Sequence, residues 1–138
     1  MEEACQRWQS DMGPEFSKDA AYILNKMTNG RYKEMKIARN FDISLKNEVG
    51  TIQRAYNYSG ATIDQMYLAL RLALVKSLSS KDERLPVILD DPFVQYDSER
   101  KQLAYSAIEE FSKENNIQII LTACVKEPFY NSAAIVEL

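Results

Sequence analysis

The stretch VILDDPFVQYDSER (residues 87–100) joins a short apolar run to an aspartate pair, a proline and a third aspartate. A short apolar run that ends in turn residues is typical of a buried strand. Residues 98–115 favour a helix with Ser98 as its N-cap, and the Ile-rich run 117–123 predicts a second strand covered on both faces. Strand, helix and strand in this order predict a right-handed parallel βαβ unit, with the pair Asp90–Asp91 at the carboxyl end of the first strand.

Four further elements are predicted outside this unit. Residues 17–28 carry apolar side chains at helical spacing and predict a helix. Residues 32–45 alternate between apolar and polar in two stretches, which predicts a β-hairpin with its turn at residues 39–40. Residues 62–79 are rich in Leu and Ala without a breaker, and they predict a helix that is buried on most sides. A last strand is expected at residues 133–138.

The chain is expected to form one α/β domain, with a parallel sheet core, flanking helices and a small N-terminal β-hairpin. Its 138 residues match the length of one ordinary domain, and its 46% hydrophobic content is enough for a single core. Residues 1–16 are polar and are interpreted as an arm, whereas residues 17–138 form the folded lobe.

Composition argues against several classes of protein. The net charge of −3 gives no overall basic field, and no Lys/Arg run stands out, so nucleic-acid binding by this chain alone would need a local patch. Cys5 and Cys124 lack metal or redox spacing, and Cys124 is expected to be a small buried hydrophobe. We expect a cytoplasmic protein with no membrane partner, because the sequence shows neither a signal peptide nor a membrane-spanning run. With no histidine in the chain, the commonest general base is missing.

The aspartate pair Asp90–Asp91 suits a magnesium site. Ligands of parallel sheets gather at the carboxyl ends of strands, and successive side chains of an extended strand point in opposite directions. One carboxylate could therefore hold a metal ion while the other contacts a water molecule. Magnesium prefers oxygen ligands and usually keeps several waters. The alternative is that the pair caps a neighbouring helix or pairs with Arg84 or Arg100 at the surface.

A second candidate site precedes the long helix, in NYSGATIDQMYLALRLAL (residues 57–74). Ser59 and Gly60 stand directly before the apolar helical run. There a hydroxyl, backbone N–H groups and the positive end of the helix can converge on an anion such as a phosphate. The plainer alternative is an ordinary serine N-cap.

Together these segments resemble the ABC-type ATPases. YSGATIDQ (residues 58–65) is similar to their signature motif, usually written L-S-G-G-Q, and VILDDPFVQYD (residues 87–97) is similar to a Walker B strand followed by a D-loop. The flanking stretches are ILNKMTNGRYKEMKI (residues 23–37) and QMYLALRLAL (residues 65–74), and they restrict the resemblance to one branch of this family. They point to the C-terminal lobe of SMC-like heads, of the SbcC and YhaN kind. The resemblance covers about residues 18–127.

The resemblance implies a role for each motif residue. Asp90 would hold magnesium through water, and Asp91 stands where the family commonly has a glutamate that acts as general base or orients the attacking water. Asp97 would be the D-loop aspartate, which communicates across a dimer of heads. The γ-phosphate of ATP held by the partner head would be contacted by the signature residues Ser59, Gly60, Ala61 and Thr62.

Three departures from the family pattern matter. The phosphate-binding loop G-x-x-x-x-G-K-[ST] is missing, so this chain cannot by itself supply the main ATP-binding surface. Asp91 is one methylene shorter than the usual glutamate. Val125 stands where the family's switch histidine would contact the γ-phosphate. ATP and Mg²⁺ are therefore expected only together with an N-terminal Walker A lobe, and any ATPase activity would be incomplete without it.

The implied function is that of the C-terminal half of an ATPase head in DNA repair or chromosome maintenance. Its expected partners are the Walker A lobe of the same parent protein, a second head, and DNA through the parent protein. A long coiled coil separates the two lobes in SMC-like proteins, so residues 1–16 would be the end of that coil. One alternative is a catalytically inactive interaction module that docks on a partner protein. Another is a phospho-acceptor receiver domain, which fits poorly because it needs its acidic pair near the chain start.

Overall fold

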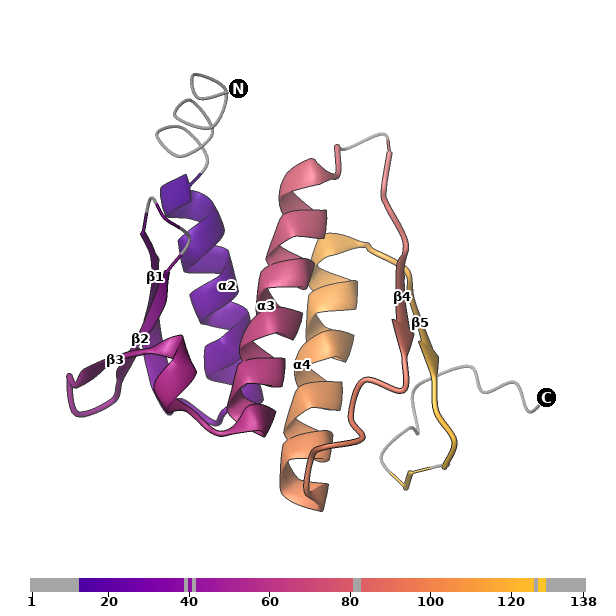
Figure 1. The fold of residues 1–138 in the computed structure, drawn as a ribbon. Coiled ribbons are helices and arrows are strands. Elements are labelled where there is room, and N and C mark those ends of the chain that lie inside the picture. The colour runs from indigo at the N-terminus through magenta and orange to yellow at the C-terminus, as the bar shows by residue number, and fades with distance from the viewer. Residues whose placement is uncertain (1–12, 39, 41, 81–82, 126, 129–138) are drawn as a thin grey trace.

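The computed structural model describes residues 13–38, 40, 42–80, 83–125 and 127–128. Figure 1 shows an antiparallel sheet on one side, three helices in the middle and a pair of parallel strands on the other side. This is the expected mixed α/β architecture; the strand expected at 133–138 lies outside the described residues. In chain order the elements are α2 (Gly13–Met27), β1 (Tyr32–Ile37), β2 (Ile43–Asn47), β3 (Ile52–Arg54), the short 3-10 helix η1 (Ala55–Asn57), α3 (Gly60–Leu78), β4 (Val87–Asp90), α4 (Ser98–Asn115) and β5 (Ile119–Thr122).

Helix α2 begins earlier than residue 17, where the sequence predicts its start. Pro14 occupies its first turn, where a proline needs no N–H partner and its fixed φ suits a helix, so the Gly-Pro pair starts the helix and does not break it. The boundary drawn after residue 16 therefore falls inside α2. The helix ends before Gly30, whose φ of 83° is left-handed and whose N–H donates to the Asn25 carbonyl at 2.9 Å.

The N-terminal sheet has the order β1-β2-β3 and is antiparallel throughout. The predicted hairpin is therefore extended by a third strand, which is too short and too exposed to give a periodic signal. Met35 pairs with Leu45 in the register, and both side chains are buried toward α2. This face of the sheet closes the core on the side of α2.

Strands β4 and β5 pair in parallel, with Val87 opposite Ile119, which confirms the strand–helix–strand unit. The expectation that both faces are covered is wrong for this chain. Val87 and Leu89 are buried, whereas Ile88 is 70% exposed and its register partner Ile120 is 45% exposed. The reason is that the helices lie on one side of the strand pair only (Figure 1). We call the apolar side formed by Ile88 and Ile120 the open sheet face.

The core is shared by the three helices and both sheets. Helix α3 is buried along one side and leaves Tyr67, Leu74 and Leu78 exposed on another, so the expectation of burial on most sides is only partly met. Among the described residues, no helix is both long and apolar enough to cross a membrane. The largest fully buried side chains are Leu24, Met27, Leu45, Met66, Leu72, Ile117 and Gln65.

Candidate functional site

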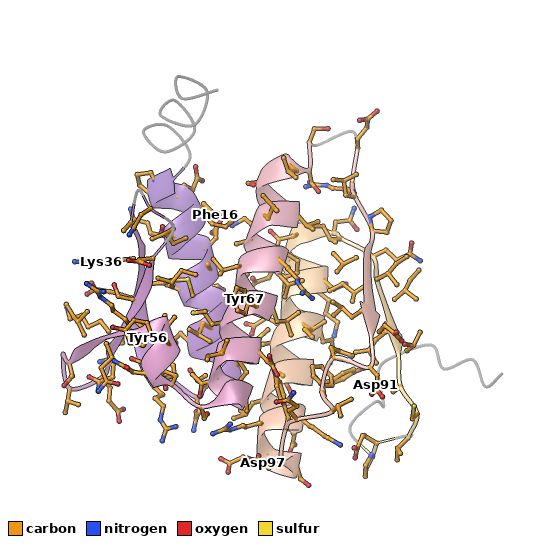
Figure 2. The ribbon with its side chains drawn as sticks, viewed as in Figure 1. Phe16, Lys36, Tyr56, Tyr67, Asp91 and Asp97 are labelled. Atoms are coloured by element: carbon orange, nitrogen blue, oxygen red, sulfur yellow. The ribbon has the colours of Figure 1, made fainter. Side chains whose placement is uncertain are left out.

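Three segments that are distant in the sequence lie along one edge of the lobe. They are the N-terminus of α3, the carboxyl end of β4, and the loop that leads into α4 (Figure 1). Figure 2 places the side chains of Asp91 and Asp97 at this edge. The fold therefore gathers the candidate signature, Walker B and D-loop residues on one side of the molecule.

The tip of α3 is built around Ser59, which is its N-cap. The Ser59 hydroxyl accepts a hydrogen bond from the Thr62 N–H at 3.4 Å and lies 3.0 Å from the Thr62 hydroxyl. Ser59 and Gly60 are exposed, Ala61 is half-buried and Thr62 is buried. The ordinary capping role is therefore present, and it leaves the first two motif residues open to a ligand. Thr62 supports the tip from inside.

Gly60 lies close to the side chain of Gln95, in the loop that follows β4. A Cβ atom at Gly60 would lie 3.4 Å from the Gln95 side-chain oxygen, at the near limit of ordinary contact. The tip of α3 and the loop between β4 and α4 therefore approach each other at the exposed Gln95 side chain. Sequence reasoning did not single out Gln95, and nothing in the sequence signals this contact because the two residues belong to different motifs.

The carboxyl end of β4 is held by its neighbour β5. The Thr122 hydroxyl donates a hydrogen bond to the Asp90 carboxylate, and the Asp91 N–H donates to the Thr122 carbonyl at 3.0 Å. Asp91 has a φ of 40°, a left-handed conformation that aspartate tolerates better than most residues. The backbone therefore leaves the extended conformation directly after Asp90. Thr122 is a site residue that sequence reasoning missed, although its place at the end of the second apolar strand is a usable signal.

The residues at this end of β4 suit magnesium only in part. The exposed Asp90 carboxylate and the Thr122 hydroxyl offer hard oxygen atoms, which magnesium prefers. In the described parts of the chain, however, no group of three or more His, Cys, Asp or Glu residues could hold an ion without help. The arrangement therefore fits a magnesium ion that takes its remaining ligands from water and nucleotide phosphates.

The surface ion pairs considered for the aspartate pair do not form among the described residues. The structure pairs Arg100 with Asp97, at 3.5 Å, and leaves Arg84 exposed. The pair Asp90–Asp91 instead interacts with Thr122 and with Cys124. Among the residues that the structure describes, no Lys or Arg forms an ion pair with Asp90 or Asp91, which leaves their charge available to a cation.

Cys124 is exposed, so the expectation that it is buried is wrong. The reason is that β5 already ends at Thr122, which leaves Cys124 in the following loop. A hydrogen bond to the Asp91 carboxylate, together with the negative charge of that carboxylate, raises the pKa of the Cys124 thiol. Desolvation and the negative charge of Asp90 also raise the pKa of this thiol. Val125, at the position expected for the switch histidine, is 66% exposed.

Asp97 is the N-cap of α4, so the expectation that Ser98 caps this helix is wrong. The Asp97 carboxylate accepts a hydrogen bond from the Arg100 N–H at 2.8 Å and remains 64% exposed. Aspartate and serine cap equally well, so local preference could not decide between adjacent positions. The opposite end behaves as predicted, since Asn116 ends the helix in a left-handed conformation.

The loop between β4 and α4 is anchored by two buried aromatic rings, those of Phe93 and Tyr96. The ring centroids of Phe93 and Tyr96 are 5.6 Å apart. In the part of the chain that the structure describes, the Tyr96 hydroxyl is the one fully buried side-chain polar atom without a hydrogen-bond partner. Burial, and then the negative charge of Asp64, raise the pKa of Tyr96, while Arg100 acts in the opposite direction. The loop is therefore fixed by apolar packing at the residue that precedes Asp97.

Comparison with curated proteins gives one relevant relative. No family model matches the chain. The chain is 30% identical over 126 residues to the protein YhaN of Bacillus subtilis (strain 168), an alignment that covers 88% of this chain. The chain spans only 13% of the length of that relative.

Two solved structures with the same fold come from work on SMC proteins. One comes from work on ATP-driven dimerization and DNA-stimulated activation of SMC ATPases; its TM-score is 0.69 at 17% identity, covering 88% of this chain and 74% of that chain. Another is the Smc head domain with an extended coiled coil bound to the C-terminal domain of ScpA, from Pyrococcus furiosus. Its TM-score is 0.57 at 19% identity, covering 78% of this chain and 28% of that chain. The resemblance to SMC-like ATPase heads is thus confirmed, and the chain adopts the fold of an SMC ATPase head lobe.

Proposed function

We propose that this chain is the C-terminal half of an SMC-like ABC ATPase head and acts in DNA repair or chromosome maintenance. It would contribute the signature motif, the Walker B strand and the D-loop to a composite Mg-ATP site. The observation that carries the proposal is the shared edge of the lobe, along which the N-terminus of α3, the end of β4 and the start of α4 all lie although they are far apart in the sequence.

These residues would serve two nucleotides. Ser59 and the free N–H groups at the start of α3 would donate hydrogen bonds to the γ-phosphate of ATP held by a second head. Asp90 would hold the magnesium ion of the nucleotide on its own head, and Asp91 would orient or deprotonate the attacking water. Magnesium, when bound, neutralises charge on the phosphates. The contact of Gly60 with Gln95 supports a link between the two nucleotides through the D-loop.

The open sheet face supports a Walker A lobe as the covering partner. Ile88 and Ile120 are register neighbours that leave apolar surface in water, and fully burying one such side chain is worth about 1.5–3 kcal/mol. The same strand pair carries Asp90 and Asp91, so a lobe that covers it would bring its nucleotide beside the acidic pair. This fits a chain whose sequence lacks a phosphate-binding loop.

A reconstituted head tests the proposal. The chain would be combined with the Walker A lobe of its parent protein, and ATP-driven dimerisation would be followed by light scattering. We expect Ser59→Arg to retain nucleotide binding and lose dimerisation, because the arginine blocks the exposed tip. We expect Asp91→Asn to retain dimerisation and lose hydrolysis. Tight Mg-ATP binding by the unassisted chain, with a one-to-one calorimetric endpoint, would contradict the composite site.

A second candidate function is an inactive ATPase-like module that docks on a partner protein. It is favoured by Val125, since an exposed apolar side chain replaces the expected γ-phosphate contact. The reconstituted head distinguishes the two functions through its ATP turnover before and after Asp91→Asn. A measurable rate that the substitution abolishes supports the ATPase, whereas turnover too low to measure in both proteins supports the module.

A further inference from the structure

The end of strand β5 holds the end of strand β4 through one residue, Thr122. The register places Thr122 opposite Asp90 in the parallel pair. The Thr122 hydroxyl donates a hydrogen bond to the Asp90 carboxylate. The Asp91 N–H donates to the Thr122 carbonyl at 3.0 Å and to the Thr122 hydroxyl at 3.3 Å. One threonine therefore contacts both members of the acidic pair.

These contacts fix the direction of the Thr122 hydroxyl. A hydroxyl has one proton and two lone pairs, whereas an ionised carboxylate only accepts hydrogen bonds. The Asp91 N–H uses a lone pair of the hydroxyl, and the single hydroxyl proton goes to the Asp90 carboxylate. Asp90 is exposed, so its carboxylate is held in place by Thr122 and still accessible to a ligand.

The segment that carries Thr122 is itself tied to two elements. Pairing with β4 holds the strand as far as Thr122. Beyond the strand, the Glu127 carboxylate accepts a hydrogen bond from the Lys101 ammonium at 2.7 Å, and these two side chains are only 21% and 27% exposed. Lys101 lies in α4, in the first turn after the Asp97 cap. The backbone around Thr122 is therefore fixed to both β4 and α4, which suits a residue that orients another.

We propose that Thr122 is the positioning residue for Asp90 at the magnesium ion of the composite site. This role rests on the proposed function, because it concerns the ion that Asp90 would hold there. An exposed carboxylate rotates freely, and fixing it when an ion binds costs side-chain entropy. A hydrogen bond that already fixes the carboxylate removes this cost before binding. Removing such a partner of a metal ligand commonly lowers metal affinity by about 10- to 100-fold.

Metal binding by the reconstituted head tests this role. All proteins carry Asp91→Asn, so that bound ATP is not consumed, and Mn²⁺ replaces Mg²⁺ so that the free ion can be measured by electron paramagnetic resonance. Thr122→Val removes the hydroxyl at nearly constant shape and should weaken Mn²⁺ binding to the ATP-loaded head by about tenfold. Thr122→Ser should restore binding to within about twofold of the parent, because serine keeps the donor. The matched control is Thr51→Val, at an exposed position just before β3, which should leave Mn²⁺ binding unchanged.

A second measurement needs neither metal nor nucleotide. In the 138-residue chain, the carbon-13 carboxylate signal of Asp90 and the amide signal of Asp91 should shift on Thr122→Val and return on Thr122→Ser. A thermal melt of each variant separates lost orientation from lost folding. The melt should be unchanged in Thr122→Val, because valine suits a strand as well as threonine does.

Two results would overturn the role of Thr122. One is that the signals of Asp90 and Asp91 do not change in Thr122→Val. The other is that they change while Mn²⁺ affinity stays within about twofold of the parent, which would confine Thr122 to the fold. The proposed function fails differently: a head that binds neither ATP nor Mn²⁺ before any change at residue 122 contradicts the composite site and this role together. Mn²⁺ binding that survives Thr122→Val contradicts the role of Thr122 alone.

Discussion

The two sheets of this lobe differ in the surface that each presents to solvent. The antiparallel sheet packs Met35 and Leu45 on α2 and turns a charged face to water. The parallel pair β4–β5 also packs one face on the core but leaves Ile88 and Ile120 in water. A charged outer face is stable in water, whereas an apolar one is stabilised further by a partner. The two sheets thus differ in solvation: the antiparallel sheet exposes a charged face, whereas the open sheet face exposes apolar side chains.

The candidate site lies at the end of the strand pair that carries the open sheet face. Asp90 ends the strand whose open face is apolar, Asp91 follows it directly, and the next loop approaches the α3 tip at Gln95. The residues proposed to act in catalysis therefore lie where the chain also offers a surface for another lobe.

The largest expected effect comes from comparing a fully buried core position with the open sheet face. Leu72 is fully buried, so Leu72→Ala should cost about 2–5 kcal/mol of the free energy of unfolding. Ile88→Ala should change it by less than about 0.5 kcal/mol, because this side chain is already in water. Urea unfolding of both variants measures the difference. Similar losses would show that Ile88 is covered in solution and would remove the distinction between the two sheets.

The next prediction asks whether Asp97 serves the fold or the proposed dimer. Asp97→Ala should cost about 1 kcal/mol in urea unfolding, because the α4 cap is lost. Asp97→Asn should stay close to the unmodified protein, because asparagine caps as well as aspartate. An Asp97→Ala variant of unchanged stability would rule out the capping role.

The same pair of variants can then be used in the reconstituted head. A loss of ATP-driven dimerisation in Asp97→Asn, at unchanged stability, would place the charge of Asp97 in communication between heads. Normal dimerisation would confine this residue to the cap.

A third prediction concerns the buried hydroxyl of Tyr96. Tyr96→Phe should stabilise the protein by about 1 kcal/mol at neutral pH, because it removes a buried polar atom that lacks a partner. Burial raises the pKa of this hydroxyl, so the native state holds the proton more firmly than the unfolded chain does. Stability should therefore fall as the pH rises through and above about 10, the ordinary tyrosine value.

The Phe variant should lack this part of the alkaline decline, which urea unfolding at several pH values would detect. Tyr105→Phe is a matched control, since Tyr105 is also buried but lies in α4. A stabilisation seen only in the Tyr105 variant would contradict the assignment of the unpaired hydroxyl to Tyr96.

The smallest expected effect is on the reactivity of the Cys124 thiol. Asp91 raises the pKa of the Cys124 thiol, so Asp91→Asn should lower that pKa and increase the thiolate fraction at a fixed pH. Alkylation by iodoacetamide near pH 8 should then be faster in the variant. Measuring both proteins in a Cys5→Ser background isolates Cys124. An unchanged rate would show that Asp91 does not contact the thiol in solution.

Apolar periodicity made the parallel unit and both long helices predictable. The apolar runs at 85–89 and 117–123 are short and bounded by turn residues, and a helical pattern separates them. Cap positions were harder to predict, because Asp97 and Ser98 are adjacent and equally able to cap α4. The strand Ile52–Arg54 escaped prediction because three exposed residues carry no period.

The candidate site residues that could be singled out from the sequence are those that belong to one short contiguous motif. Ser59, Gly60, Asp90 and Asp91 stand out in their own motifs. Gln95, Thr122 and Cys124 do not, because each acquires its role from a residue on another element. Contacts of this kind depend on strand register and loop packing, which local preference does not fix.

The sequence by itself determined the order of the elements, the acidic strand end and the serine-capped helix, because each depends on neighbours within one or two turns of chain. Tertiary structure alone decided which sheet face remains apolar and open, and which single basic residues become neighbours. The physical reason is that coverage and charge clustering arise between segments far apart in the chain, through pairing such as that of Lys36, Ser44 and Arg54 across three strands.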